Sequence, residues 1–383
     1  LRVTEVYPLT LFAVAGMLLF PIATDLITLF VALEVLSLPL YLMAGLSRRR
    51  RLMSQEAALK YFLLGAFSSA FFLFGVAYLY GYSGSITLSG IQQSVVGGSG
   101  NDIFLLLGIA FLSVGLLFKV GAVPFHAWTP DVYQGAPTPI TAFMAAATKI
   151  AAFGAMLRIF YVSLANAEWS WRPIIMTIAI ITMALGSLVA IAQRDVKRML
   201  AYSTISHMGF MMLGMLSIFD QHAYSAALFY AVTYVLTTLG SFGLLMILSR
   251  QGYECETLDD LKGLNRRNPW LAFMGLILMF SLAGIPPTVG FAAKLSILET
   301  LVDAGHLYIA IIAVMTSLIG AFYYLRVVKC MYFDEPTQTA AIEGGAIAKT
   351  TFTLNGLFVL GCGIYPATLM ALCLTAMSKT LLS

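Results

Sequence analysis

The sequence predicts an all-α, polytopic membrane protein with about eleven transmembrane helices. Of its 383 residues, 60% are hydrophobic and only 10% are charged, and the mean hydropathy is +0.89. Soluble domains carry about 25% charged residues, so this chain has too few charges to cover a water-facing surface. The apolar residues also lie in runs of the roughly 20 residues that a helix needs to cross a bilayer. A soluble globular protein is therefore excluded.

Turn-forming and charged residues divide the chain into eleven apolar runs. Most have the length of one straight crossing, but the ninth would extend about 50 Å as a continuous helix, which is too long for a bilayer. We therefore expect the ninth to be broken. The predicted spans are 6–21, 24–46, 56–80, 102–122, 137–162, 173–192, 197–217, 222–249, 269–303, 305–333 and 349–381.

Glycine and proline interrupt two of the predicted helices. The ninth run contains Gly284 and Pro286, and the fourth ends at Gly121 and Pro124. Non-helical backbone at membrane depth is tolerated where it is buried in protein or lines a wet cavity. Matching interruptions in two halves point to an inverted repeat with ion sites near the midplane. The predicted units are a first five-helix repeat at 1–163, a second inverted repeat at 173–333 and a C-terminal transmembrane helix at 349–383.

The basic residues orient these spans. Of the 22 lysines and arginines, fifteen fall in alternate loops, including the cluster Arg48 to Arg51, and three fall on the opposite side, at Arg158, Arg172 and Lys379. The positive-inside rule places the loops with fifteen in the cytoplasm. Although the net charge is +4, the basic residues lie in short clusters between apolar runs, so nucleic-acid binding is not predicted.

Four lysines remain within or just inside apolar spans: Lys60, Lys119, Lys149 and Lys294. A lysine at the bilayer centre costs at least about 2.5–3.5 kcal/mol, so these positions predict a function. Lys60 is the weakest candidate, because it lies one turn inside its span beside Glu56 and can reach the interface by snorkelling. For the other three, the alternative is a static charge that only holds helices together.

One carboxylate, Glu34, lies at the middle of a predicted span. At about 6 Å and an effective dielectric constant near 20, its attraction for a lysine such as Lys119 would be about 3 kcal/mol. A movement that changes this separation could load or release a proton. The sequence therefore predicts a proton-relay pair.

Four further side chains are candidates for proton transfer. His207 lies near mid-span among hydroxyl residues and could carry protons between lysines, or it could be a satisfied structural donor. His126 follows the first break, where we expect it at the cytoplasmic end, tying the loop or serving proton uptake. Tyr323 and Tyr324 are candidate exit-side hydroxyls, although interfacial aromatic anchoring is an alternative.

Cofactor chemistry is not expected on this chain. The four cysteines, Cys255, Cys330, Cys362 and Cys373, show no CxxC spacing, so neither a disulfide framework nor a metal site is predicted. Glycine-rich nucleotide-binding fingerprints and iron–sulfur cysteine clusters are also lacking in the sequence. Redox partners, if any, would carry the electrons.

Three motifs carry a family resemblance: 118–139, with Asp-Val-Tyr-Gln-Gly-Ala-Pro-Thr-Pro at its end, 202–209 and 281–291. Together they resemble the antiporter-like membrane subunits of respiratory complex I, the NADH-quinone oxidoreductase. The wording of the first is similar to the subunit N branch of that family, whose mitochondrial counterpart is NADH dehydrogenase subunit two. That fold has fourteen spans, so the resemblance implies that this chain corresponds to spans four to fourteen, with the first three missing.

The resemblance also implies roles and partners. The family's essential glutamate falls on Glu34, its pumping lysine on Lys119, its central relay lysine on Lys149 and its second-half lysine on Lys294. The implied function is proton transfer across a bacterial inner membrane, driven by NADH oxidation and quinone reduction elsewhere. NADH, FMN, iron–sulfur clusters and quinone would then reside in partner subunits, and the membrane neighbours would be subunits M, K, J and A. The alternatives are a subunit of an Mrp-type cation/proton antiporter and a passive scaffold.

Overall fold

A computed structural model gives the fold of residues 4–47, 51–98, 102–217, 221–249, 254–337, 342 and 344–382. This part of the chain is almost entirely helical and contains eight helices long and apolar enough to cross a membrane, with two shorter apolar helices. The predicted class, an all-α polytopic membrane protein, is confirmed. The basic residues Arg2, Arg48, Arg49, Arg50 and Arg250, which helped to orient the chain, lie outside the described residues.

The first half of the chain forms a group of helices with one break. Most predicted spans are confirmed to within a few residues. The helices are α1 (Val6–Ile22), α2 (Leu26–Ala44), α3 (Arg51–Ser83), α4 (Leu88–Gly97), α5 (Ile103–Val120), α6 (Trp128–Gly135) and α7 (Thr138–Arg158), which continues as a π-helix over Ile159–Ser163.

The second half follows after a short 3₁₀ turn, Ala165–Ala167. Its helices are α8 (Glu168–Ile191), α9 (Val196–Leu213), α10 (Gln221–Leu248), the short α11 (Leu264–Arg267) preceded by a 3₁₀ turn at Leu258–Leu261, α12 (Pro269–Ala283), α13 (Val289–Asp303), α14 (Leu307–Tyr332), α15 (Ala346–Ile364) and α16 (Pro366–Leu382).

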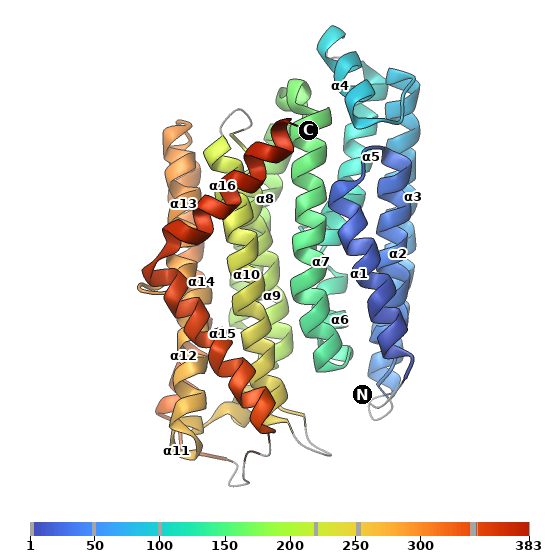
Figure 1. The fold of residues 1–383 in the computed structure, drawn as a ribbon. Helices are drawn as coiled ribbons and strands as arrows, with labels where there is room; N and C mark the ends of the chain where they lie inside the picture. The colour runs from blue at the N-terminus through green and yellow to red at the C-terminus, as the bar shows by residue number, and fades with distance from the viewer. Residues whose placement is uncertain are drawn as a thin grey trace.

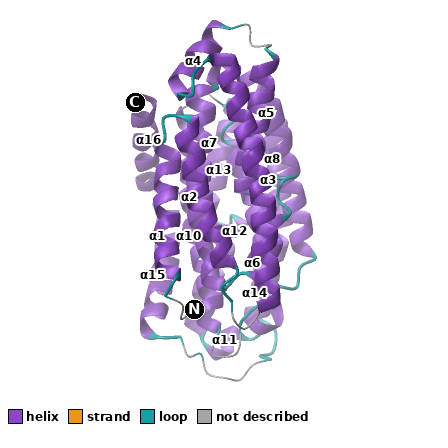
Figure 2. Ribbon diagram, turned by 90° about the vertical axis from the view of Figure 1, so that its right-hand side faces the viewer, coloured by secondary structure: helices purple, strands orange, loops and turns teal. Residues whose placement is uncertain are grey.

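The long helices run roughly side by side as one bundle (Figure 1). Helices α1 to α3 and α5 form one side of the view, α7 lies in the middle, and α8 to α10 with α12 to α14 form the other side. Helices α15 and α16 cross the outside of the second group. Helix α4 lies at one end of the bundle and α11 at the other (Figure 2); we call these the α4 end and the α11 end.

Both predicted breaks are present. Helix α5 ends at Gly121 and helix α12 ends at Gly284, with left-handed φ values of 81° and 82°. An L-residue with a side chain rarely adopts this conformation, whereas glycine does so at little cost. In each break the glycine N–H donates back to the carbonyls three and four residues earlier. The chain then resumes as α6 or α13.

The two halves repeat several local features in the same order. The carboxylates of Asp25 and Asp195 cap the first turns of α2 and α9, and the backbone of each aspartate forms a β-bridge, with Thr87 and Thr257 respectively. Arg158 donates to the carbonyl of Pro21 at the end of α1, and Arg326 donates to that of Ile191 at the end of α8. These matched pairs support the inverted repeat, whose unit boundaries stay a prediction.

Several elements differ from the sequence-based expectations. The last span, predicted as one helix over 349–381, is two helices, because Pro366 has no N–H to continue the helix. At this bend Gly363 packs so closely on the second break that a Cβ there would lie 2.1 Å from the carbonyl oxygen of Pro287. Helices α4 and α6 were not predicted, because each is too short to give a periodic apolar pattern.

The close approach of α8 and α9 leads to a prediction about stability. A Cβ on Gly186 of α8 would lie 2.6 Å from the backbone nitrogen of Ser206 on α9, and backbone cannot move aside as a side chain can. We expect Gly186→Ala to destabilise the protein by about 1–3 kcal/mol, the usual cost of overpacking. Thermal unfolding of the detergent-purified protein should show this. Gly361→Ala is the control, since a Cβ there meets nothing within 4 Å, and equal midpoints for the two variants would contradict the packing argument.

Candidate functional site

Lys119 lies near the end of α5, two residues before the first break, and is only 2% exposed. Its amine donates to the hydroxyl of Ser37 on α2 at 2.8 Å and to that of Tyr61 on α3 at 3.3 Å. The amine therefore bridges three helices through neutral hydroxyl groups. Its surroundings place a proton-carrying group in the interior of the first half.

Glu34 lies one helical turn before Ser37 on α2 and is half-buried. Its carboxylate accepts a hydrogen bond from the hydroxyl of Ser69 on α3. The ion pairs among the described residues do not include Glu34 with Lys119. The predicted pair is therefore not a salt bridge, but the carboxylate is near enough to act on the amine as a charge.

Lys149, on α7, is 1% exposed and reaches the end of α5. Its amine donates to the carbonyl oxygens of Lys119 at 3.1 Å and Val120 at 2.9 Å. The carbonyls at a helix C-terminus carry partial negative charge, which favours a cation. The end of α5 at the break therefore supplies hydrogen-bond acceptors for the Lys149 amine, and a carboxylate is not needed to bind it.

The indole of Trp128, the first residue of α6, lies between the two lysines. The Lys149 amine sits 4.6 Å from the centre of the indole ring, a cation–π geometry. On α3, the Tyr61 ring that contacts Lys119 stacks on the indole with centroids 4.6 Å apart. The indole N–H donates to the Phe118 carbonyl at 2.9 Å. Trp128 therefore connects the surroundings of Lys119 and Lys149 through aromatic contacts.

His207 on α9 is held between two tyrosines. Its Nδ1 lies 2.7 Å from the hydroxyl of Tyr230 and its Nε2 lies 3.0 Å from that of Tyr324. Tyr324 is in turn hydrogen-bonded to Ser203. Each imidazole nitrogen thus has a hydroxyl that can both donate and accept, so the arrangement can conduct a proton through the ring or hold one tautomer.

Lys294 lies on α13, after the second break. Its amine donates to the Ala283 carbonyl at 2.9 Å and to the Ser317 hydroxyl at 2.7 Å. A small cavity separates this amine from His207, lined by both residues and by five hydroxyl groups. The hydroxyls belong to Tyr230, Thr233, Tyr234, Thr237 and Ser281.

The Thr233 hydroxyl has no hydrogen-bond partner among the described residues although it is buried. Buried polar groups of this kind are commonly satisfied by an internal water. The cavity is therefore suited to water that links His207 with Lys294, as the predicted hydrated pocket beside the second break requires.

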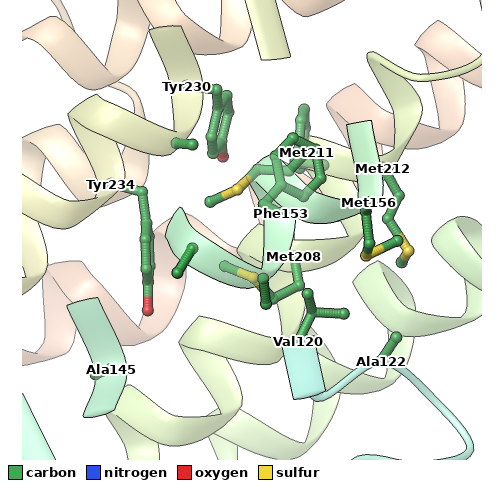
Figure 3. Packing of buried hydrophobic residues seen from close by; sticks show 14 of the residues in the cluster. Val120, Ala122, Ala145, Phe153, Met156, Met208, Met211, Met212, Tyr230 and Tyr234 are labelled. Carbon is green, nitrogen blue, oxygen red and sulfur yellow. The ribbon is translucent and has the colours of Figure 1, made fainter. Parts of the chain in front are cut away.

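Apolar side chains fill the space where α7 meets the second half (Figure 3). Phe153 and Met156 of α7 pack there with Met208, Met211 and Met212 of α9, and all five are at most 1% exposed. Phe153 is one turn beyond Lys149, and Met208 is next to His207. The polar groups of the two halves thus approach each other across a methionine-rich region.

Lys60 belongs to an ionic network that joins α3 and α6 of the first half to α9 of the second half. Its amine pairs with Glu56 at 2.7 Å and with Asp131 of α6 at 2.8 Å, and its side chain is 42% exposed. Arg198 of α9 contacts the other oxygen of Asp131 at 2.7 Å. Burial raises the pKa of the Asp131 carboxyl, but hydrogen bonds from Lys60 and Arg198 outweigh this, so that its pKa lies below the ordinary 3.8.

The Asp131 network makes a second stability prediction. Because the Asp131 pKa is lowered on folding, its stabilising contribution is present above pH 3.8 and is lost as the pH falls through the folded-state value. These side chains are partly exposed, so we expect Asp131→Asn to cost no more than about 1 kcal/mol at pH 7. Unfolding midpoints of the two proteins should converge only below pH 3.8. A constant difference down to pH 2.5 would rule out this ion-pair explanation.

The fold bears on three other candidate residues, His126, Tyr323 and Tyr324. His126 is half-buried and lies between the first break and the eight-residue helix α6, and its expected place at the cytoplasmic end stays a prediction. Tyr323 and Tyr324 are 1% and 2% exposed, so they lie inside the bundle and cannot be lipid-facing anchors. Their roles in proton transfer stay predictions.

The sequence-based reading missed several residues at the site. Ser37, Tyr61 and Trp128 are ordinary core residues by sequence, and only the fold brings them to the lysines. Lys197 was counted as a loop lysine, yet it is 1% exposed and donates to the Ala136 carbonyl at 2.7 Å. It lies two residues after the helix cap Asp195, and the predicted span 197–217 began at it, so its place in the first turn of a helix was available from the sequence.

Comparison with known proteins identifies relatives over nearly the whole chain. Residues 23–320 match the family described as NADH:quinone oxidoreductase/Mrp antiporter, TM. The chain is 50% identical to NADH-quinone oxidoreductase subunit N of Thiobacillus denitrificans, covering 98% of this chain and 77% of the relative. It is 54% identical to the subunit N of Rhodococcus opacus, covering 88% and 62%. The predicted resemblance to subunit N is confirmed.

Solved structures show the same fold. A chain of respiratory complex I from Thermus thermophilus, with bound aureothin, superposes with a TM-score of 0.83 at 38% identity, covering 96% of this chain and 79% of that one. A chain of the Mrp complex from a Dietzia species gives a TM-score of 0.86 at 24% identity, covering 97% and 77%. The likeness to the Mrp chain concerns the fold alone.

Proposed function

The chain belongs to the NADH:quinone oxidoreductase/Mrp antiporter transmembrane family, and from this premise we propose that it moves protons across the membrane as the subunit N of an NADH-quinone oxidoreductase. The observation that carries the proposal is the pair of buried lysine amines on the carbonyl ends of broken helices, Lys149 at Val120 and Lys294 at Ala283. Ionisable groups inside a membrane protein are costly and mark proton or ion pathways.

Proton transfer in the first half would begin near Glu34. Ser37 lies one turn along α2 and accepts from the Lys119 amine, so a carboxylate that gains or loses a proton changes the charge close to this lysine. Trp128 and Tyr61 separate Lys119 from Lys149 by aromatic rings. A proton on one amine therefore raises the electrostatic cost of a second proton on the other, which favours loading them in turn.

Transfer in the second half would use His207 and Lys294. The hydroxyl-lined cavity between them can hold water, and the tyrosines on both imidazole nitrogens can donate or accept a proton. The methionine-rich packing between the halves should keep this path from being continuously wet. Such an interruption is needed, because each proton moved against 100 mV gains about 2.3 kcal/mol and would return through an open path.

Membership of the family supports a proposal for partners and location. We infer that the chain works within a multi-subunit membrane assembly, beside subunits M, K, J and A, in the bacterial inner membrane. NADH, FMN, iron–sulfur clusters and quinone would be bound by partner subunits. The energy of the redox reaction would reach this chain through the membrane neighbours, so its own task is proton transfer.

The Mrp antiporter alternative is less well supported. The relatives that are about half identical over most of this chain are named as subunit N, whereas the Mrp chain is 24% identical. A scaffold without transport would not need lysines buried to 1% or 2% exposure. Proton transport in the oxidoreductase is thus the function that the site favours.

The proposal is tested by Glu34→Gln in the assembled complex. Glutamine keeps the shape and can still accept from Ser69, but it cannot carry the negative charge, so we expect proton translocation to fall by about fivefold, an energetic effect near 1 kcal/mol. Proton uptake by membrane vesicles, measured together with NADH oxidation, gives the result. Glu335→Gln is the control, because Glu335 is 76% exposed. Normal pumping by an assembled Glu34→Gln variant would remove Glu34 from the pathway.

A further inference from the structure

Corresponding backbone carbonyls in the two halves of the chain each accept a hydrogen bond from a lysine amine. In each break the carbonyl belongs to the residue just before the left-handed glycine: Val120 before Gly121 and Ala283 before Gly284. The Lys149 amine donates to the first at 2.9 Å and the Lys294 amine donates to the second at 2.9 Å. An aromatic ring lies beside each amine, Trp128 at 4.6 Å and Phe210 at 5.4 Å from the ring centre.

The two lysines nevertheless come from helices that do not correspond. Lys149 lies on α7, whose counterpart in the second half is α14, because Arg158 and Arg326 cap the ends of the corresponding helices α1 and α8. Lys294 instead lies on α13, the continuation of the broken helix. The carbonyl that accepts the hydrogen bond therefore has the same place in both halves, whereas the lysine comes from a different helix in each.

The counterpart of Lys149 on α14 is Ser317. Arg158 and Arg326 are 168 positions apart, and the same interval relates Thr148 to Thr316, whose hydroxyls both donate to the carbonyl four residues earlier. Applied to Lys149, this interval gives Ser317. The Ser317 hydroxyl lies 2.7 Å from the Lys294 amine. The residue that corresponds to Lys149 therefore contacts the lysine amine of the second half, whereas Lys149 itself supplies the amine in the first half.

We propose that Ser317 is a positioning residue for the Lys294 amine and that a lysine at 317 can replace Lys294 at the carbonyl of Ala283. The proposal rests on the proposed function, in that Lys294 must take part in proton transfer. The fixed element of each site is the carbonyl end of the broken helix, and the amine can be supplied from either of two helices. In the first half, Lys149 reaches Val120 from the position that Ser317 occupies in the second.

The test is an exchange of the two side chains in the complete membrane complex. Lys294→Ser should lower proton translocation per NADH oxidised, and Lys294→Ser with Ser317→Lys should recover at least about half of the loss. The matched control is Lys294→Ser with Ser317→Met, which has similar length but no ionisable group. An exchange variant that assembles yet pumps no better than this control would overturn the proposal. Normal pumping by Lys294→Ser alone would instead overturn the role of Lys294 in the proposed function, and this inference with it.

A second measurement keeps the proposal testable if the exchange variant does not assemble. Ser317→Thr retains the hydroxyl, whereas Ser317→Val has the same shape as threonine without the hydrogen-bonding group. We expect the threonine variant to pump at nearly the native rate and the valine variant about two- to fivefold more slowly, the effect of losing one hydrogen bond while the amine keeps the Ala283 carbonyl as an acceptor. Equal rates for the two variants would show that Ser317 does not position the amine.

Discussion

Replacing Lys149 by methionine should lower proton translocation by at least about tenfold while the complex still assembles. Methionine fills nearly the same volume and adapts to irregular packing, so the loss should come from the missing amine. General acid–base groups contribute about 10²–10⁴-fold to proton-transfer steps, which sets the scale. Proton uptake by membrane vesicles, divided by the rate of NADH oxidation, measures the effect independently of the amount of complex.

Lys149→Arg separates a relay from a fixed charge. A guanidinium can still donate to the carbonyls of Lys119 and Val120 and lie over Trp128, but it does not release its proton in a protein. We expect this variant to assemble and to remain defective in pumping. If arginine sustains the native pumping rate, Lys149 serves only as a fixed cation at the end of α5.

The hydrophobic pattern predicted the spans well because each long helix satisfies its own backbone within the membrane. The break at Gly284 was readable because two prolines in sequence cannot continue a helix. The bend at Pro366 was not separated from its helix, since a single proline within an apolar run can be tolerated as a kink. Local rules therefore predict where a helix is, but not always where it stops.

The lysines at the site were predictable, whereas their surroundings were not. Lys119, Lys149 and Lys294 stand out because a charge in an apolar run is costly wherever it points. Their partners are serine and tyrosine hydroxyls, backbone carbonyls and an indole ring, none of which is unusual in a helix sequence. We expected the Glu34 carboxylate as the partner of Lys119; it interacts with this amine as a charge, whereas the hydrogen bonds of the amine go to two hydroxyls.

Helix ends explain how the membrane interior holds these amines. At the break in α5 and again in α12, backbone carbonyls lack their usual helical partners and concentrate partial negative charge. Amines at Val120 and Ala283 satisfy the carbonyls and are in turn stabilised as cations. A neutral amine can keep contact with the same oxygen through its remaining N–H groups, so release of a proton need not dismantle the site.

The final prediction concerns Lys119. Lys119→Met should lower proton translocation by at least about tenfold, because it removes the amine that donates to the hydroxyls of Ser37 and Tyr61. Assembly should persist, since the side chain is enclosed by uncharged groups and its removal leaves no buried charge unpaired. The measurement is the number of protons moved per NADH oxidised, with complex content checked by native gel electrophoresis.

Ser37→Ala provides the graded comparison that distinguishes a relay from a packing role for Lys119. It keeps the amine but removes its nearest acceptor at 2.8 Å, so we expect a loss of only about two- to fivefold, the effect of one hydrogen bond when the Tyr61 hydroxyl remains as an acceptor. A relay that passes from Glu34 along α2 to Lys119 requires the order native, Ser37→Ala, Lys119→Met in decreasing pumping rate. If Ser37→Ala pumps normally and Lys119→Met does not, protons reach Lys119 by a route that avoids Ser37, and the connection from Glu34 must run through water along α3 instead.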